Sequence, residues 1–328
     1  MVQEEVLKLF EYLPSNDRLE EALNEIFAHE GPVTISHRGK NDYTSTHPSE
    51  IIRCRLAGGM EREVFLKYEI ESHSKIDDHR NNLKYESNVY RQVLSPVGMS
   101  TPKYYGSYFF EETHLIMLAI EYFNDLVKFS KSKDEPNIIV KAGRWLGEFQ
   151  NRSQKIIRDG GAAFMRRYDE EYFMKWPQIT LDRIIDLNLE KEYAWLFELV
   201  DQYNFHIKAL TEAEPVVIHG EFYPTNVRYA RRTLYPLDWQ TAALSPGEID
   251  IASLTHFWPD KKMLELTLKE YWTVRQLNEP VRKFKKRVLL ATMYLNFLWI
   301  RYHSDTIVSR SGKGLKFFDN LRELQALL

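Results

Sequence analysis

Strand-forming segments are concentrated in the first third of this chain, and this distribution limits most strongly what it can fold into. Five runs rich in β-branched and aromatic residues lie between residues 33 and 123: VTIS, EIIRCRLA, REVFLKY, KYYGSYFF and HLIMLAIEYF. Gly58 and Gly59 separate the second run from the third, and such a pair readily adopts the positive φ angles of a tight hairpin. We therefore expect a small antiparallel sheet in this part of the chain.

Helical periodicity dominates the remainder. One helix is predicted from about Asp77 to Leu94, between the third and fourth strands, and two short ones precede the first strand. From Asp134 onward the apolar spacing is mostly helical, except for a strand–loop–strand stretch at 216–240. Further helices are predicted near 180–187, 189–210, 261–276 and 282–303. The sequence therefore predicts an α+β protein of two lobes, residues 1–122 and residues 123–328, the second mostly helical with one small hairpin.

Composition excludes several classes of protein. Apolar residues make up 44% of the chain and charged residues 28%, which is typical of a globular protein. A net charge of −3 gives no basic face for nucleic acid, and the most apolar run, 288–300, is too short to span a bilayer. Cys54 is the single cysteine, and the N-terminus lacks the features of a signal peptide. We expect a cytoplasmic protein without nucleic-acid or membrane partners.

Lys67 is an unusual residue in its predicted strand. Strand alternation places it on the face opposite to Leu66 and Tyr68, where it is either an edge-strand gatekeeper or an inward charge with a partner. The following helix carries Glu86 within its apolar stripe, and a carboxylate buried there without a cation would be very costly. We therefore expect Lys67 and Glu86 to form an ion pair, an arrangement that kinases use to hold a lysine against nucleotide phosphates.

The segment VVIHGEFYPTNVRYARRTLYPLDWQ, residues 216–240, carries a set of polar side chains around its loop: His219, Glu221, Asn226 and Asp238. Phosphoryl transfer needs a carboxylate near the acceptor hydroxyl and oxygen ligands that hold magnesium against the phosphates. Glu221, Asn226 and Asp238 provide such a set, while His219 is suited to organising the loop. A zinc site of His219 and Glu221 would lack further histidine or cysteine ligands nearby. A purely structural polar hairpin would explain Asn226 alone.

HGEFYPTNV, followed by PLDWQTAALSPGEIDIASL, resembles the aminoglycoside phosphotransferase and choline kinase family, whose fold is that of the protein kinases. The resemblance implies a two-lobe protein-kinase-like fold with a catalytic hairpin in its second lobe. It also implies an ATP- and Mg²⁺-dependent enzyme, with GTP as the alternative nucleotide, that phosphorylates a hydroxyl of a small molecule. An aminoglycoside, an amino sugar, an amino alcohol or a related metabolite is the expected kind of acceptor.

The resemblance also assigns roles to individual residues. Lys67 would contact the nucleotide phosphates and Glu86 would hold it, while the backbone of the segment from Glu121 to Phe123 would bind the adenine. In the loop region the implied roles are Glu221 as catalytic base, Asn226 and Asp238 as magnesium ligands, and His219 and Asp250 as supports of the catalytic loop.

Two departures from the family pattern bear on activity. Glu221 stands where the family has aspartate; it keeps the charge but moves the carboxylate by roughly one C–C bond. The loop after the first strand contains only Gly39, so Thr44, Ser45 and Thr46 are the candidate phosphate donors there. These departures leave a nucleotide-binding pseudokinase with a regulatory or scaffold role as the alternative to an active enzyme.

Residues that could contact an acceptor are acidic and aromatic, a mixture that would suit a cationic substrate. They are Tyr168, Asp169, Glu170, Glu171, Tyr172, Trp176, His256, Phe257, Trp258 and Asp260. The segment RRYDEEYFMKW is equally consistent with an amphipathic helix whose charged face is solvated. The basic run RKFKKR at 282–287 is expected to face solvent at the start of a helix.

Overall fold

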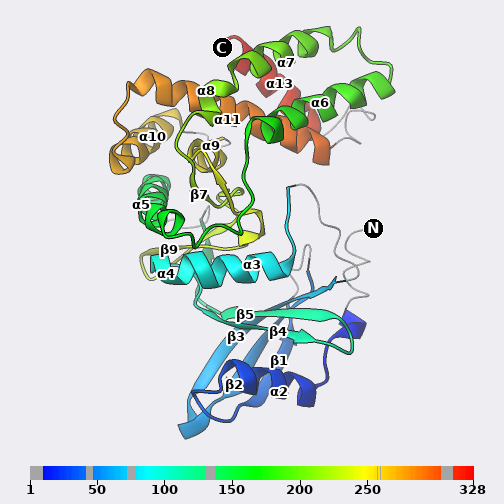
Figure 1. The fold of residues 1–328 in the computed structure, drawn as a ribbon, viewed down its shortest axis with the longest axis vertical. Helices are drawn as coiled ribbons and strands as arrows, with labels where there is room; N and C mark the ends of the chain where they lie inside the picture. Colours follow the sequence, from blue (N-terminus) through cyan, green and yellow to red (C-terminus); the bar gives the residue numbers. More distant parts are fainter. Residues whose placement is uncertain are drawn as a thin grey trace. The chain divides into compact units, whose positions relative to one another are not determined.

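A computed structural model describes residues 10–41, 47–71, 79–129, 137–256, 258, 260–303 and 313–328 (Figure 1). The chain divides into two compact units: Met1–Lys131 with Asn226–Thr241, and Ser132–Thr225 with Ala242–Leu328. The second unit is thus interrupted by a short excursion that belongs to the first. The division into lobes at residue 122 remains a prediction, and the two units are described one at a time.

A five-stranded antiparallel sheet forms the centre of the first unit, as predicted, in the order β1-β2-β3-β5-β4. Its strands are β1 (Thr34–Lys40), β2 (Ser49–Arg55), β3 (Glu61–Ile70), β4 (Tyr104–Phe110) and β5 (Leu115–Glu121). Between β2 and β3 the short 3₁₀ turn η2 (Ala57–Gly59) contains Gly58 and Gly59 with φ of +75° and +78°. The glycine pair therefore makes the tight connection that the sequence indicates.

The two faces of this sheet are covered by different helices (Figure 1). Helix α2 (Asn16–Ile26) follows the 3₁₀ turn η1 (Phe10–Tyr12), and the Ser15 hydroxyl caps it by accepting from the backbone N–H of Arg18. Its buried Leu19 and Leu23 join Leu66 in one apolar core. Alternation along β3 turns Lys67 to the opposite face, toward helix α3 (Leu83–Val89).

Helix α3 begins later than the sequence pattern suggests. The Asn82 side chain caps it by accepting a 2.9 Å hydrogen bond from the backbone N–H of Tyr85, and residues 79–82 are not helical. The predicted start near Asp77 itself lies outside the described residues. The helix continues through a π-helical turn, η4 (Tyr90–Leu94), into α4 (Ser95–Val97), and ends at Gly98 with φ of +65°. The end predicted at Leu94 is thus three residues early.

The hairpin predicted within 216–240 is present but smaller. It consists of β8 (Val227–Ala230) and β9 (Thr233–Pro236), and the 3₁₀ turn η6 (Trp239–Thr241) follows it. On its other edge β8 pairs with β6 (Val127–Lys128) of the first unit. Strand β7 (Val216–Ile218) instead pairs with β10 (Ala243–Ser245) in the second unit. Asn226 and Asp238 therefore flank one hairpin, whereas His219 and Glu221 follow a strand of another sheet.

Helices make up most of the second unit (Figure 1). They are α5 (Ile138–Arg158), α6 (Glu170–Asp186), α7 (Ala194–His206), α8 (Lys208–Thr211), α9 (Glu248–Thr255), α10 (Lys261–Arg275), α11 (Val281–Tyr302) and α13 (Lys313–Gln325). Helix α6 starts ten residues before the predicted 180, because Asp169 caps it by accepting from the backbone N–H of Tyr172. The helix predicted over 189–210 begins only at Ala194. Among the described residues no helix is long and apolar enough to cross a membrane.

Candidate active site

Lys67 lies between two carboxylates of the first unit. Its Nζ donates to Glu86 Oε2 at 2.7 Å and to Asp238 Oδ1 at 2.8 Å. The predicted ion pair with Glu86 is confirmed, while the contact with Asp238 is an addition that the strand and helix patterns do not indicate. We call these three residues the lysine cluster. With both carboxylates ionised, the lysine cluster carries a net charge of −1.

Glu86 links the lysine to the backbone that follows Asp238. Its side chain is 2% exposed, and its second oxygen, Oε1, accepts a 3.1 Å hydrogen bond from the Trp239 N–H. Both oxygens of the buried carboxylate are therefore used. Removing one partner from such a buried pair typically costs about 3–5 kcal/mol, because the other charge stays buried without compensation. Glu86 thus fixes Lys67 and the start of η6 together.

Asp238 keeps its negative charge over the whole physiological range. Burial disfavours its ionised form, but attraction and a hydrogen bond from Lys67, with smaller contributions from Arg80 and His47, lower its pKa to about 2. The side chain is 36% exposed. Within the described part of the chain, its second oxygen, Oδ2, accepts no hydrogen bond or ion pair. A permanently charged oxygen is therefore available beside the lysine.

The backbone at Asp238 is left-handed, with φ of +68°, a conformation that costs a non-glycine residue about 1–2 kcal/mol. The bonds of Lys67 to its side chain and of Glu86 to the next N–H hold it there. Strain of this kind persists where the surrounding structure fixes the residue, and it is concentrated at functional sites.

Asn226 is brought near Asp238 by the β8–β9 hairpin. Its carbonyl accepts a 2.9 Å hydrogen bond from the Leu237 N–H at the open end of the hairpin, and Asp238 is the next residue. An amide and a carboxylate are the oxygen ligands that Mg²⁺ uses when it keeps its waters and substrate phosphates. Among residues with a described position, no three His, Cys, Asp or Glu side chains are grouped to hold a metal. The residues fit a magnesium ion shared with phosphates better than a zinc site.

The segment after β5 presents unused backbone groups. Glu121 ends the strand, and its N–H donates to the carbonyl of Lys103 at 2.8 Å. Phe123 lies just beyond, with its ring 4.6 Å from that of Tyr235 in β9. No residue that the structure describes hydrogen-bonds to the backbone N–H or carbonyl of Phe123. Such groups suit the edge of a nucleobase.

In the second unit, the loop after β7 is held by Asp250 near the start of α9. Asp250 is fully buried; its Oδ2 accepts from the His219 N–H at 2.7 Å and its Oδ1 from the Gly220 N–H at 2.8 Å. These bonds use backbone N–H groups, while the Nδ1 atom of the His219 ring accepts from the Glu221 N–H at 3.3 Å. Asp250 and His219 thus support the same loop by different bonds.

Glu221 follows directly on this supported turn. Gly220 has φ of +85°, a left-handed conformation that a glycine adopts without steric cost. Glu221 is 3% exposed, and the next side chain, Phe222, packs with its ring 5.8 Å from that of Trp145. The loop that carries the candidate base is therefore fixed on both sides.

The Asp250 carboxyl gives the protein a predictable dependence of stability on pH. Burial raises its pKa from 3.8 to about 7, against the hydrogen bonds that favour the ionised form. The folded protein therefore retains a proton that the unfolded chain loses, and the free energy of unfolding should fall as pH rises from about 4 to 7, by roughly 1.4 kcal/mol per unit at most. Urea unfolding of Asp250→Asn across this range should give a flatter dependence than the wild type. The exposed helix cap Asp260→Asn serves as control, and an unchanged slope in Asp250→Asn would contradict the assignment.

Two residues that act on the lysine cluster were not predicted from any sequence pattern. His47 and Arg80 both act on Asp238, and burial together with the Lys67 charge lowers the pKa of His47 to about 3. Both adjoin segments that the structure does not describe, and the predicted phosphate donors Thr44, Ser45 and Thr46 lie outside the described residues. Of the acceptor candidates, Trp176 and Tyr168 are buried, whereas Glu170 and Glu171 are exposed on α6, and Phe257 lies outside the described residues.

The fold is that of the protein-kinase-like class, as comparison with solved structures shows. The GDP complex of wild-type aminoglycoside 2'-phosphotransferase-IIIa has a TM-score of 0.62 at 13% identity, over 95% of this chain and 99% of that chain. A choline/ethanolamine kinase family protein from Mesorhizobium loti gives 0.57 at 14%, over 95% and 94%. The spectinomycin phosphotransferase APH(9)-Ia in complex with ADP and spectinomycin gives 0.56 at 14%, over 94% of each chain.

The sequence itself identifies the family. Residues 83–277 match the model of the phosphotransferase enzyme family (APH), and the chain belongs to that family. The resemblance to aminoglycoside phosphotransferases and choline kinases is therefore confirmed. A search of curated proteins gave no match.

Proposed function

We propose that this protein is a kinase that transfers the terminal phosphoryl group of ATP or GTP to a hydroxyl of a small molecule. The observation that carries the proposal is Lys67 Nζ held at 2.7 Å from Glu86 and 2.8 Å from Asp238. A lysine fixed by a helix carboxylate, next to a charged aspartate with one unused oxygen, is what the phosphates and metal of a nucleotide require.

On this proposal, Lys67 binds the α and β phosphates, and the backbone at Glu121 to Phe123 binds the base. The solved relatives contain GDP in one case and ADP in the other, and both nucleotides are candidates here. Asp238 and Asn226 would hold magnesium, which neutralises charge on the phosphates when bound. Asp238 keeps the charge needed for this at any physiological pH.

Glu221 is the proposed catalytic base. Its carboxylate accepts the proton of the acceptor hydroxyl while the oxygen forms a bond to the terminal phosphorus. The bond from that phosphorus to the bridging oxygen breaks, and the nucleoside diphosphate leaves with the electron pair. Asp250 and His219 hold the backbone from which Glu221 extends. We further propose a cytoplasmic location, which agrees with the buried, unpaired Cys54.

A second candidate is a nucleotide-binding pseudokinase, and the glutamate at position 221 is the specific observation in its favour. The two candidates share the nucleotide site and differ in turnover. The bonds that support the Glu221 loop favour the enzyme, because a binding module has no need to hold a base in place.

Nucleotide binding provides the first test. ATP or GTP with Mg²⁺ at 100 times its Kd should raise the free energy of unfolding by about 2.7 kcal/mol, which corresponds to a Tm increase of roughly 2–4 °C. We would measure Tm by calorimetry with each nucleotide, with and without Mg²⁺. A screen for nucleoside diphosphate production over amino sugars, amino alcohols and aminoglycosides then separates enzyme from pseudokinase. Absence of any thermal shift would reject both candidates.

A further inference from the structure

Gln150 is a fully buried polar side chain on α5 that lies between three elements of the second unit. Its Oε1 accepts a 2.6 Å hydrogen bond from the Tyr271 hydroxyl of α10, and its Nε2 donates to the Gly247 carbonyl at 3.4 Å. The same Gly247 carbonyl accepts from the Asp250 N–H at 3.2 Å, and the Gln150 amide lowers the pKa of the Asp250 carboxyl. A buried amide can make these bonds at once only when its oxygen faces the tyrosine and its nitrogen faces the carbonyl and carboxylate.

Gly247 allows this close approach at the start of α9. A Cβ atom at this position would lie 2.4 Å from Gln150 Oε1 and 2.4 Å from the Tyr271 hydroxyl. Any other residue would therefore displace the pair. The first turn of α9, which carries Asp250, is thus in direct contact with Gln150 and Tyr271.

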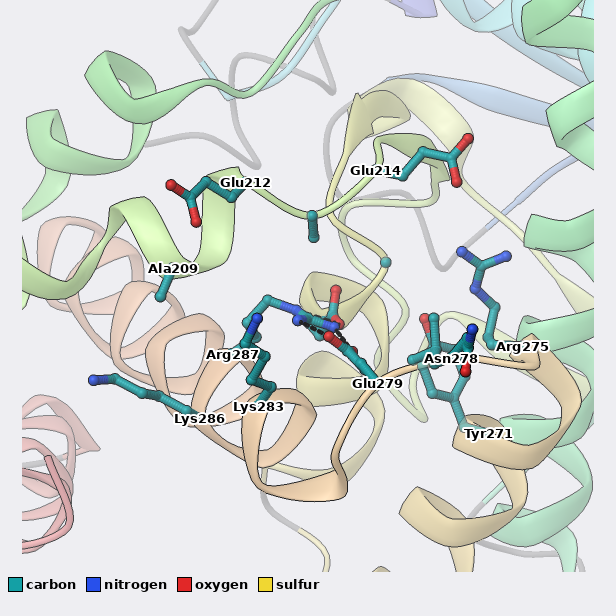
Figure 2. A pocket seen from close by; sticks show the side chains of 14 residues that line it. Ala209, Glu212, Glu214, Tyr271, Arg275, Asn278, Glu279, Lys283, Lys286 and Arg287 are labelled. Carbon is teal, nitrogen blue, oxygen red and sulfur yellow. Dashed lines mark hydrogen bonds and ion pairs between the residues drawn. The ribbon is translucent and has the colours of Figure 1, made fainter.

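A second set of bonds holds the same turn from the side of a cavity of about 390 Å³ (Figure 2). Arg287 of α11 is 9% exposed and forms ion pairs with Glu248, the first residue of α9, and with Glu279. Figure 2 shows Tyr271 on the wall of this cavity and Arg287 directed at Glu279. Arg287 therefore does not face solvent, contrary to the expectation for the run RKFKKR. The turn is fixed from both sides, and only the Gln150 side reaches Asp250.

We propose that Gln150 and Tyr271 are positioning residues that act on the catalytic loop through Asp250. The Tyr271 hydroxyl fixes the orientation of the Gln150 amide, and the amide N–H stabilises the Asp250 carboxylate. The carboxylate in turn holds the backbone N–H groups of His219 and Gly220, which precede Glu221. The expected kinetic effect rests on the proposed function, whereas the structural link between these side chains and the loop does not depend on it.

The sign of the pH effect follows from the groups around Asp250. Those acting on it directly are the two loop N–H groups and the Gln150 amide. Beyond the amide, the Tyr271 hydroxyl experiences the charges of Asp250, Arg275 and Glu248, and Glu248 is paired with Arg287. The Gln150 N–H favours the ionised form, so its removal raises the pKa of Asp250. A protonated Asp250 loses one of its two acceptor oxygens for the loop. The acidic limb of the kcat–pH profile should therefore move to higher pH.

The test compares Gln150→Met and Tyr271→Phe with two matched controls. Thr292→Val removes a hydroxyl on α11 that bonds only to the Val288 carbonyl of its own helix, at 2.8 Å. Thr267→Val removes a fully buried hydroxyl on α10 that bonds only within its helix. We expect Gln150→Met to lower kcat about fivefold at pH 7 with KM within twofold, to move the acidic limb up by about one unit, and to recover at pH 9. Tyr271→Phe should act in the same direction with about a third of that effect, and the controls should leave the limb in place.

A second readout does not depend on turnover. Hydrogen exchange of the peptide covering residues 216–222 should accelerate in Gln150→Met and Tyr271→Phe but not in the controls, since the His219 and Gly220 amides lose part of their acceptor. If the wild type turns over no acceptor, the proposed function fails, while exchange still decides the positioning role. Equal exchange and an unmoved acidic limb in both variants and both controls would overturn the proposal.

Discussion

The variant Asp238→Asn should lose kinase turnover on the order of a thousandfold while remaining folded, because it removes one charge at the phosphates and little else. Asparagine tolerates the left-handed backbone that Asp238 adopts, with φ of +68°. The substitution also leaves Lys67 with one charged partner, Glu86 at 2.7 Å, so the lysine cluster becomes neutral overall. Steady-state kinetics with a responsive acceptor, together with Tm in the absence of nucleotide, measure the two parts of this expectation.

Asp125→Asn is the matched control for this variant. Asp125 lies in the same unit, is 41% exposed against 36% for Asp238, and forms a 3.0 Å ion pair with Arg231. Its replacement should change turnover by less than about twofold, as expected for an exposed pair. If Asp238→Asn kept both its activity and the thermal shift with nucleotide and Mg²⁺, the metal role of Asp238 would be wrong.

The lysine cluster illustrates how far sequence reasoning extends. Strand alternation and a helical stripe predict the pair of Lys67 and Glu86, because each signal is local. The contact of Lys67 with Asp238 joins residues 171 positions apart, and no local period encodes it. The resemblance to a family supplied Asp238 as a metal ligand, but the bond to the lysine is known only from the structure.

Some errors in the predicted elements also arise from pairing between distant residues, and one arises from a local cap. Apolar runs indicate strands at both ends of the segment 216–240, but their period does not name a partner, so β7 could pair with β10 instead of β8. The helix near Glu86 begins at Leu83 because Asn82 caps it. The prediction followed the apolar stripe and did not use this short-range signal. The charge of Arg287 suggested solvent exposure, whereas Glu248, distant in sequence, pairs with it in the interior.

Glu221 is the residue at which sequence and structure still permit two functions. An added methylene would misplace the carboxylate if the loop were that of an aspartate enzyme, and a displacement of about 1 Å can cost on the order of a hundredfold in rate. The structure holds this loop by Asp250, by the His219 ring and by Phe222 against Trp145. A loop supported so fully can present the longer side chain in one fixed position. We therefore infer that the loop is shaped to place the carboxylate of a glutamate.

Two substitutions at this position separate the alternatives. Glu221→Gln retains shape and removes the base, and should lower kcat by about 10²–10⁴-fold with little change in nucleotide binding. Glu221→Asp retains the base and shortens it, and should lower kcat by roughly a hundredfold, since the surrounding loop is set for glutamate. Glu214→Gln, an exposed residue just before β7, is the control and should match the wild type. Kinetics with saturating nucleotide and acceptor check the series. Equal turnover in the wild type, Glu221→Gln and Glu221→Asp would overturn the role of Glu221 as base, because only a working base makes the charge and the length of this side chain matter. Absence of turnover in the wild type with every acceptor would favour the pseudokinase.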